Sequence, residues 1–175
     1  VKVTSITLLT HNMGGLIARS ACHYGMQKQY GWLRKLKNVV FLGTPHHGAP
    51  LERGGNMFQR AVGVIPFAAP LARLGMLRSA GVTDLRYGAL VDEDWNRRGR
   101  FDHAPDDRAV LSLPAGVHYF AAAATLGKAL GDAKDTVLGD GLVPVDSALG
   151  QHPEAQRCLY FSPSQQALFY QRSHW

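Results

Sequence analysis

The feature that most constrains the fold is a short apolar strand that runs directly into a glycine-containing turn and a helix. Ser5–Thr10 is β-branched and aliphatic with little alternation, which predicts a buried strand. Apolar residues at helical spacing over Met13–Cys22 predict a helix. Asn12 lies between them, and Gly14 and Gly15 allow strand and helix to approach closely. A tight strand–turn–helix unit of this kind indicates an α/β architecture.

Three more apolar segments predict the rest of a sheet. Asn38–Leu42, Gly116–Ala123 and Arg157–Phe161 each have the length and composition of a buried strand. The first helix should end near Gly25, and further helical segments separate the strands. This order predicts an α/β fold with a mainly parallel sheet and helices on both faces.

The middle of the chain predicts an insertion within a single domain that spans residues 1–175. Residues 54–100 contain helical patches around Met57–Val62 and Ala68–Leu77, broken by prolines and glycines. A loop-and-helix insertion at this point of the chain is where a cap over a substrate-binding site would lie. Its apolar residues are candidate lining of a substrate pocket, and packing between helices explains them equally well. The candidates are Val64, Ile65, Phe67 and Leu71.

Composition narrows the classes of protein that fit. With 46% hydrophobic and 18% charged residues, the 175-residue chain has the profile of a globular domain. No apolar stretch approaches the roughly 18 residues of a membrane span. The net charge of +6 is spread among acidic residues with no aromatic platform, which argues against a nucleic-acid partner. No targeting signal is recognisable, and the isolated Cys22 and Cys158 fit a reducing, cytoplasmic compartment only weakly.

The turn has the layout of a nucleophile elbow, in which a strained residue between small neighbours carries the attacking atom. Gly14 fills the last position of the usual G-x-S-x-G pattern, and Thr10 stands at the first, where a smaller residue is more comfortable. The central residue is Asn12, whose amide cannot be activated as a nucleophile by a neighbouring base. The backbone N–H of Met13 would still be placed as an oxyanion donor.

A second motif strengthens this interpretation. Phe41–Pro50 reads F-L-G-T-P-H-H-G-A-P and follows the next strand. Together with Thr10–Leu16, it resembles the lipase and esterase group of the α/β-hydrolases, near the GPI-inositol-deacylase-like families, in which H-S-M-G-G precedes G-T-P-H-x-G. The resemblance implies that the chain is the carboxyl-terminal part of such a domain, with its first strands absent. The edge at Ser5–Thr10 would then be exposed, so self-association is expected.

The resemblance also implies the acid and the base of a catalytic triad. A D-G-x-V-P segment holds the acid in this family, and Asp140 matches it; Asp135 is a rival, while Asp146 looks like the N-cap of a following helix. Because the histidine comes last in this fold, it should lie beyond the acid. His152 precedes the expected last strand, so His174 is favoured although it is next to the chain's end.

Metal and cofactor chemistry is not indicated. His46 and His47 lack an evident third ligand, so a polar turn packed beside the elbow is the favoured interpretation. Neither cysteine has metal-ligand spacing, and two free, largely buried thiols are expected. We therefore expect neither a metal nor a cofactor.

The function that these residues imply is hydrolysis of a carboxylic ester, with a small-molecule or lipid ester as substrate. Asn12 should leave the chain inactive or strongly impaired, because it replaces the serine of the family. The alternative is a non-catalytic protein that binds a lipid or ester on the hydrolase fold. A third interpretation, deamidation of Asn12 to an aspartate nucleophile, is disfavoured because the bulky Met13 slows deamidation.

Overall fold

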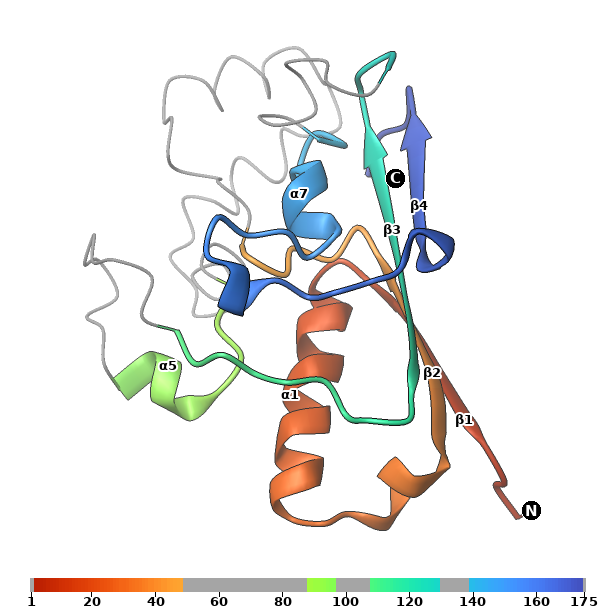
Figure 1. Ribbon diagram of the computed structural model, residues 1–175, viewed down its shortest axis with the longest axis vertical. Coiled ribbons are helices and arrows are strands. Elements are labelled where there is room, and N and C mark those ends of the chain that lie inside the picture. Colours follow the sequence, from red (N-terminus) through yellow and green to blue (C-terminus); the bar gives the residue numbers. More distant parts are fainter. Residues whose placement is uncertain (1, 49–87, 97–107, 130–138, 175) are drawn as a thin grey trace, which may run out of the picture.

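The structure is a computed structural model that describes residues 2–48, 88–96, 108–129 and 139–174 (Figure 1). Its centre is a four-stranded sheet in the order β1-β2-β3-β4, in which every neighbouring pair is parallel. The strands are β1 (Ile6–His11), β2 (Leu36–Leu42), β3 (His118–Thr125) and β4 (Gln166–Tyr170). The predicted α/β fold with a parallel sheet is confirmed.

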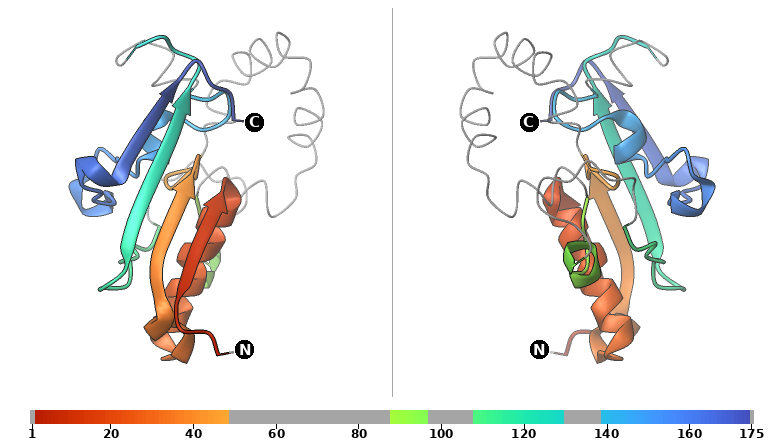
Figure 2. Two further views of the ribbon diagram at one scale, coloured as in Figure 1. Left: turned by 90° about the vertical axis from the view of Figure 1, so that its right-hand side faces the viewer. Right: turned by 90° about the vertical axis from the view of Figure 1, so that its left-hand side faces the viewer.

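The helices of the described ranges lie on one face of this sheet (Figures 1 and 2). They are α1 (Met13–Gln27), α5 (Asp92–Asn96) and α7 (Val145–Ala148), with 3₁₀ turns at Gly31–Lys35, Ala155–Arg157 and Pro163–Gln165. The described residues do not form the second helical layer that the sequence predicts. None of the helices in these ranges is long and apolar enough to cross a bilayer.

The hydrophobic core lies between the sheet and the helices that cover one of its faces. Alternate residues of the two central strands point into it, so that Val39, Phe41, Ala121 and Ala123 are almost fully buried. The core is completed by buried residues of α1, α7 and the loops: Cys22, Val143, Val145, Ala148, Leu149 and Phe161. Exposed and partly buried residues alternate along the edge strand β1, and Leu9 is 71% exposed.

The last strand differs from the prediction. Arg157–Phe161 was expected to be β4, but Arg157 ends a 3₁₀ turn and the apolar residues after it run over the end of α7. Phe161 is buried in the core from this loop, which explains the apolar pattern without a strand. The strand that pairs with β3 is Gln166–Tyr170, an edge strand whose exposed and polar positions hide its sequence signal.

The first helix ends at Gln27, near Gly25 as expected, and Gly25 is buried within it. One further expectation needs correction. The predicted N-cap role of Asp146 is wrong, because α7 begins at Val145 with Pro144 in the N-cap position. Asp146 instead lies exposed in the first turn, where its negative charge is favourable next to the helix N-terminus.

Candidate functional site

Asn12 occupies the sharp turn between β1 and α1. Its φ of 52° and ψ of −126° lie in a region that residues other than glycine rarely adopt. Its N–H donates to the Leu42 carbonyl at 2.9 Å, and its carbonyl accepts from Gly15 N–H at 3.1 Å. Thr10 is also accommodated, because its hydroxyl donates to the Val40 carbonyl at 2.9 Å. The turn is therefore held by both neighbouring elements in the geometry of an elbow.

Two polar groups of this turn make no hydrogen bond within the turn or the helix that follows it. Met13 is the first residue of α1, so its backbone N–H belongs to those without an acceptor inside the helix. The side-chain oxygen of Asn12 is buried and has no hydrogen-bond partner among the described residues. Strained backbone clusters at functional sites, so these two groups make the turn a candidate for one.

The G-T-P-H-H-G loop packs against the start of α1. A Cβ atom placed on Gly15 would overlap the Thr44 side chain, which is completely buried, whereas a Cβ on Gly14 would be 3.9 Å from the nearest atom, on Thr10. Gly15 is therefore required by close packing between the elbow helix and this loop, and Gly14 has room for a methyl group.

This difference predicts the effects of two matched substitutions. Gly15→Ala should lower the free energy of unfolding by about 1–3 kcal/mol, because Thr44 has nowhere to move. Gly14→Ala adds the same methyl group in the same helical turn and should be neutral or slightly stabilising. Urea unfolding of the two variants measures both values. Equal stabilities would show that the contact with Thr44 does not constrain the elbow.

Asp140 and His174 form a buried pair. The His174 Nδ1 lies 2.7 Å from Asp140 Oδ2, and both side chains are nearly inaccessible to solvent. The other carboxylate oxygen, Oδ1, accepts from the N–H groups of Leu142 and Val143 at 3.0 and 2.9 Å. His174 N–H also donates to the Asp140 carbonyl at 3.0 Å. This network fixes the imidazole against a carboxylate across 34 residues of sequence.

The pair lies beside the elbow. A Cβ atom on Gly43 would be 3.2 Å from His174 Cε1 and 3.3 Å from Asp140 Oδ2, and Gly43 directly follows the residue whose carbonyl accepts the Asn12 N–H. The rings of His174 and His11 have centroids 4.7 Å apart. The predicted residues Asn12, Asp140 and His174 are thus gathered at the carboxyl ends of the parallel strands.

The rival residues lie elsewhere or outside the described ranges. Asp146 is exposed on α7. The His152 ring contacts the His47 ring at a tilt of 53°, with centroids 4.9 Å apart, and neither residue belongs to the Asp140–His174 pair. Asp135 lies outside the described residues, as do the four candidate pocket residues Val64, Ile65, Phe67 and Leu71 and most of the 54–100 insertion.

His46 is a packed residue of the loop. It is 1% exposed, meets the Phe41 ring edge-on at 4.7 Å between centroids, and contacts the guanidinium of Arg19. Burial first, and then the Arg19 charge, hold its pKa well below the usual range. Burial also lowers the pKa of His47, to about 4. The described residues include no group of three or more His, Cys, Asp or Glu that could hold a metal ion.

Three contributors to this region were not singled out from the sequence. Gly43 adopts a φ of 52° and leaves space for the acid–base pair. His11 donates from its Nε2–H to the His174 carbonyl at 3.3 Å, and so holds the carboxyl-terminal segment on the elbow. Arg19 is buried beneath the G-T-P-H-H-G loop. A glycine directly after an apolar strand was the available signal for Gly43; the other two depend on tertiary contacts.

Fold and site together define an α/β-hydrolase of the lipase/esterase-like superfamily. The sequence of residues 1–110 matches the family described as PGAP1-like alpha/beta domain, and the chain belongs to that family.

Comparison with solved structures supports the fold. The chain is similar to the lipase BlEst2 of Bacillus licheniformis in its mature form, with a TM-score of 0.51 and 19% sequence identity. The match covers 98% of this chain and 59% of the lipase, so this chain spans little more than half the length of that relative. No curated protein matched the sequence.

Proposed function

We propose that the chain has the architecture of a serine-type carboxylic-ester hydrolase in which Asn12 stands at the nucleophile position. The other roles fall to His174 as base, Asp140 as the acid that orients it, and the Met13 N–H as an oxyanion donor. The observation that carries the proposal is the buried 2.7 Å Asp140–His174 contact beside a turn with positive φ. A small-molecule or lipid ester is the corresponding substrate class.

The chemistry of such a site requires a hydroxyl at position 12. Its oxygen would attack the ester carbonyl carbon while the base imidazole takes the proton, and the carbonyl oxygen would become the oxyanion that backbone N–H groups stabilise. Collapse would expel the alcohol with that proton, and water would then release the acid by the same steps. A carboxylate oxygen only accepts hydrogen bonds, so Asp140 keeps the His174 proton on Nδ1 and leaves Nε2 as the base.

The chain as written should be inactive or strongly impaired. The Asn12 amide has no lone pair or proton that His174 can activate for attack. A fluorophosphonate probe tests the site directly, because it labels only an activated serine. We expect labelling of Asn12→Ser and no labelling of the parent chain or of Asn12→Ser/His174→Gln. A folded Asn12→Ser variant that stays unlabelled would contradict the proposal.

The alternative is a non-catalytic protein that binds an ester or lipid. The buried side-chain oxygen of Asn12 favours this alternative, because it has no partner in the described part of the chain and a bound ligand could donate to it. Titration of the parent chain with a non-hydrolysable ketone analogue of a short ester distinguishes the two proposals. Tight binding that Asn12→Ala abolishes, together with an inactive Asn12→Ser variant, would favour the binding protein.

The proposed domain organisation places the four described strands last in the fold, with the 54–100 segment as a cap. Preceding strands would then pair with the outer edge of β1, where Leu9 is exposed. The 175-residue chain on its own should pair through this edge with a second copy.

Self-association is tested with a charged residue on that edge. Leu9→Lys should weaken dimerisation by at least about tenfold, because lysine on an edge strand opposes pairing with another chain. Ile17→Lys is the matched control, since Ile17 is also apolar and exposed but lies on α1. Sedimentation velocity gives the dissociation constants. A monomeric parent chain at high concentration would count against the edge proposal.

A further inference from the structure

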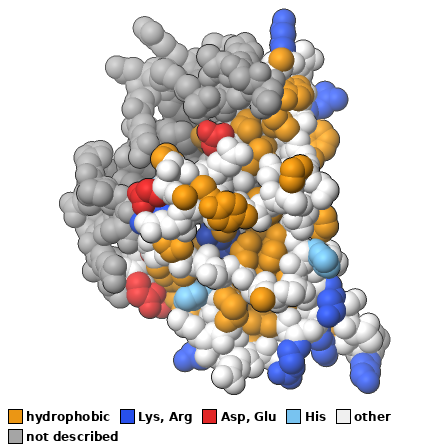
Figure 3. Space-filling model, in the orientation of Figure 1, with side chains coloured by type: hydrophobic (Ala, Val, Ile, Leu, Met, Phe, Trp, Pro, Cys, Tyr) orange, Lys and Arg blue, Asp and Glu red, His pale blue; other side chains and the backbone are white. Residues whose placement is uncertain are grey.

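A cavity separate from the candidate active site lies between α1, the loop after β2 and two later loops. Its volume is about 310 Å³, which is within the range of small-molecule sites. Residues 108–113 and 156–160 form much of its wall, and Arg19, His46 and His47 form the rest together with Gly88, Leu90 and Tyr119. None of Asn12, Asp140 and His174 lines it. Figure 3 shows Lys or Arg atoms recessed among hydrophobic side chains on this face of the molecule.

Arg19 brings a positive charge to the wall of this cavity, and no Asp or Glu among the described residues forms an ion pair with it. It is 7% exposed, and its Nη1 lies 3.4 Å from His46 Nδ1 and 3.3 Å from the His46 carbonyl oxygen. Its Nε is buried without a partner among the described residues. Burial first, and then the charge of the nearby Arg108, lower the pKa of Arg19 to about 10, so the group stays charged at neutral pH. A buried cation that is not paired costs folding free energy.

The carboxylate of Asp94 favours the charged form of Arg19 through space, without an ion pair between the two side chains. The Asp94 carboxylate oxygens accept hydrogen bonds from the backbone N–H groups of Leu90, Val91 and Ala109 at 2.9, 3.3 and 2.8 Å. Asp94 therefore holds parts of the cavity wall together, and no Asp or Glu is among the described residues that line the cavity.

His46 adds a second unused donor. A guanidinium only donates, so the 3.4 Å contact with Arg19 makes His46 Nδ1 the acceptor. The neutral ring then carries its proton on Nε2, and this atom is buried without a partner among the described residues. Arg19 Nε–H and His46 Nε2–H are thus two buried donors, from two residues that line the same cavity, that lack an acceptor.

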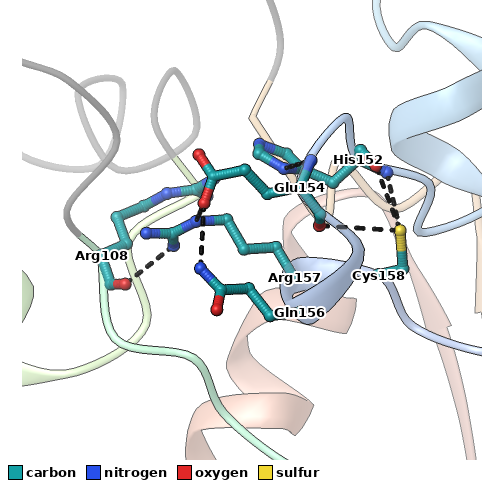
Figure 4. Close-up of polar contacts among 6 residues, drawn as sticks. All are labelled: Arg108, His152, Glu154, Gln156, Arg157 and Cys158. Carbon is teal, nitrogen blue, oxygen red and sulfur yellow. Dashed lines mark hydrogen bonds and ion pairs between the residues drawn. The ribbon is translucent and has the colours of Figure 1, made fainter.

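Two further arginines make the rim of the cavity basic. Arg157 forms an ion pair with Glu154 at 3.1 Å and donates to the Arg108 carbonyl at 2.8 Å (Figure 4). Arg108 in turn donates to the Gly88 carbonyl at 3.2 Å. These bonds fix both side chains at the wall of the cavity. Their guanidinium groups add positive charge to the cavity wall, and the ion pair with Glu154 offsets that of Arg157 in part.

We propose that this cavity binds the oxyanion group, phosphate or carboxylate, of a small molecule, with Arg19 and His46 as the buried donors. An oxyanion supplies the acceptors that both donors lack among the described residues, and it brings a negative charge into direct contact with Arg19. The site does not use the elbow or the acid–base pair, so it stands whether or not the chain descends from an ester hydrolase.

The experiment follows the Arg19 Nε–H signal by ¹⁵N–¹H NMR in the 175-residue chain. Sodium phosphate, glycerol phosphate and sodium acetate are titrated separately at constant ionic strength against sodium chloride. We expect a saturable shift of this signal and of the His46 ring signals. Saturation by the two phosphates alone assigns a phosphate ligand, and saturation by acetate alone assigns a carboxylate. A response no larger than that to chloride in all three series overturns the proposal.

Substitutions then connect the binding to the cavity. Arg19→Met should weaken the anion affinity by at least about tenfold, because a charge-assisted hydrogen bond is lost. Arg34→Met removes the same charge from an exposed position in the Gly31–Lys35 turn and should leave the affinity unchanged. An equal loss in both variants would show a non-specific charge effect and overturn the proposal. The shift of Arg19 Nε–H in the parent chain decides the matter if Arg19→Met does not fold.

Discussion

Asn12→Ser is expected to raise the rate of p-nitrophenyl butyrate hydrolysis by at least about 10³-fold over the parent chain. Loss of the nucleophile in a serine hydrolase of another fold costs about 10⁶ in kcat. If the described strands are the last four of the fold, the chain lacks the loop that gives the second oxyanion donor, and one missing donor costs about 10²–10³. A serine at position 12 should therefore restore a rate increase of roughly 10³-fold.

The structure gives two reasons why a serine would be active at this position. The backbone at residue 12 already has the strained geometry, since its φ is 52° in the presence of asparagine. The Asp140–His174 pair is also assembled and buried without a serine. The measurement compares initial rates of the parent, Asn12→Ser and Asn12→Ala at equal folded concentration. Equal rates for the serine and alanine variants would leave the binding protein as the better proposal.

Most of the fold could be predicted because its signals are local. Parallel strands buried by helices are continuous apolar runs, and β1, β2 and β3 are found within two residues of the predicted positions. The last strand could not be predicted in this way. An edge strand has fewer buried residues, whereas the loop at Phe161 supplies apolar residues to the core, so hydrophobicity favoured the wrong segment.

The residues of the candidate site that belong to recognisable sequence motifs could be predicted. Asn12 follows from the strand–turn–helix pattern, and Asp140 and His174 follow from the resemblance and the order of the triad. What the sequence could not show is how the site is supported. The cavity for the pair depends on the backbone of Gly43, and the buried charge of Arg19 depends on contacts with a loop 27 residues away.

The second large effect concerns Asp140 in the Asn12→Ser background, where Asp140→Asn should abolish the gained activity, a loss of at least about 10³-fold. The amide oxygen can still accept the N–H groups of Leu142 and Val143, so the loop should keep its structure. The amide nitrogen, however, would donate to His174 Nδ1. The imidazole proton would then move to Nε2, where it prevents the ring from taking a proton, and an exchange of this kind costs about 10⁴ in kcat in serine proteases.

Asp146→Asn is the matched control, because it removes the same charge from an exposed position in the first turn of α7. Its activity should stay within about twofold of that of Asn12→Ser, since surface changes of this kind cost little. Urea unfolding should show similar midpoints for both double variants, which separates catalysis from stability. Because rate and stability are measured on the same proteins, a folded Asp140→Asn variant that retains the activity would remove Asp140 from the triad and leave its buried contact with His174 a structural one.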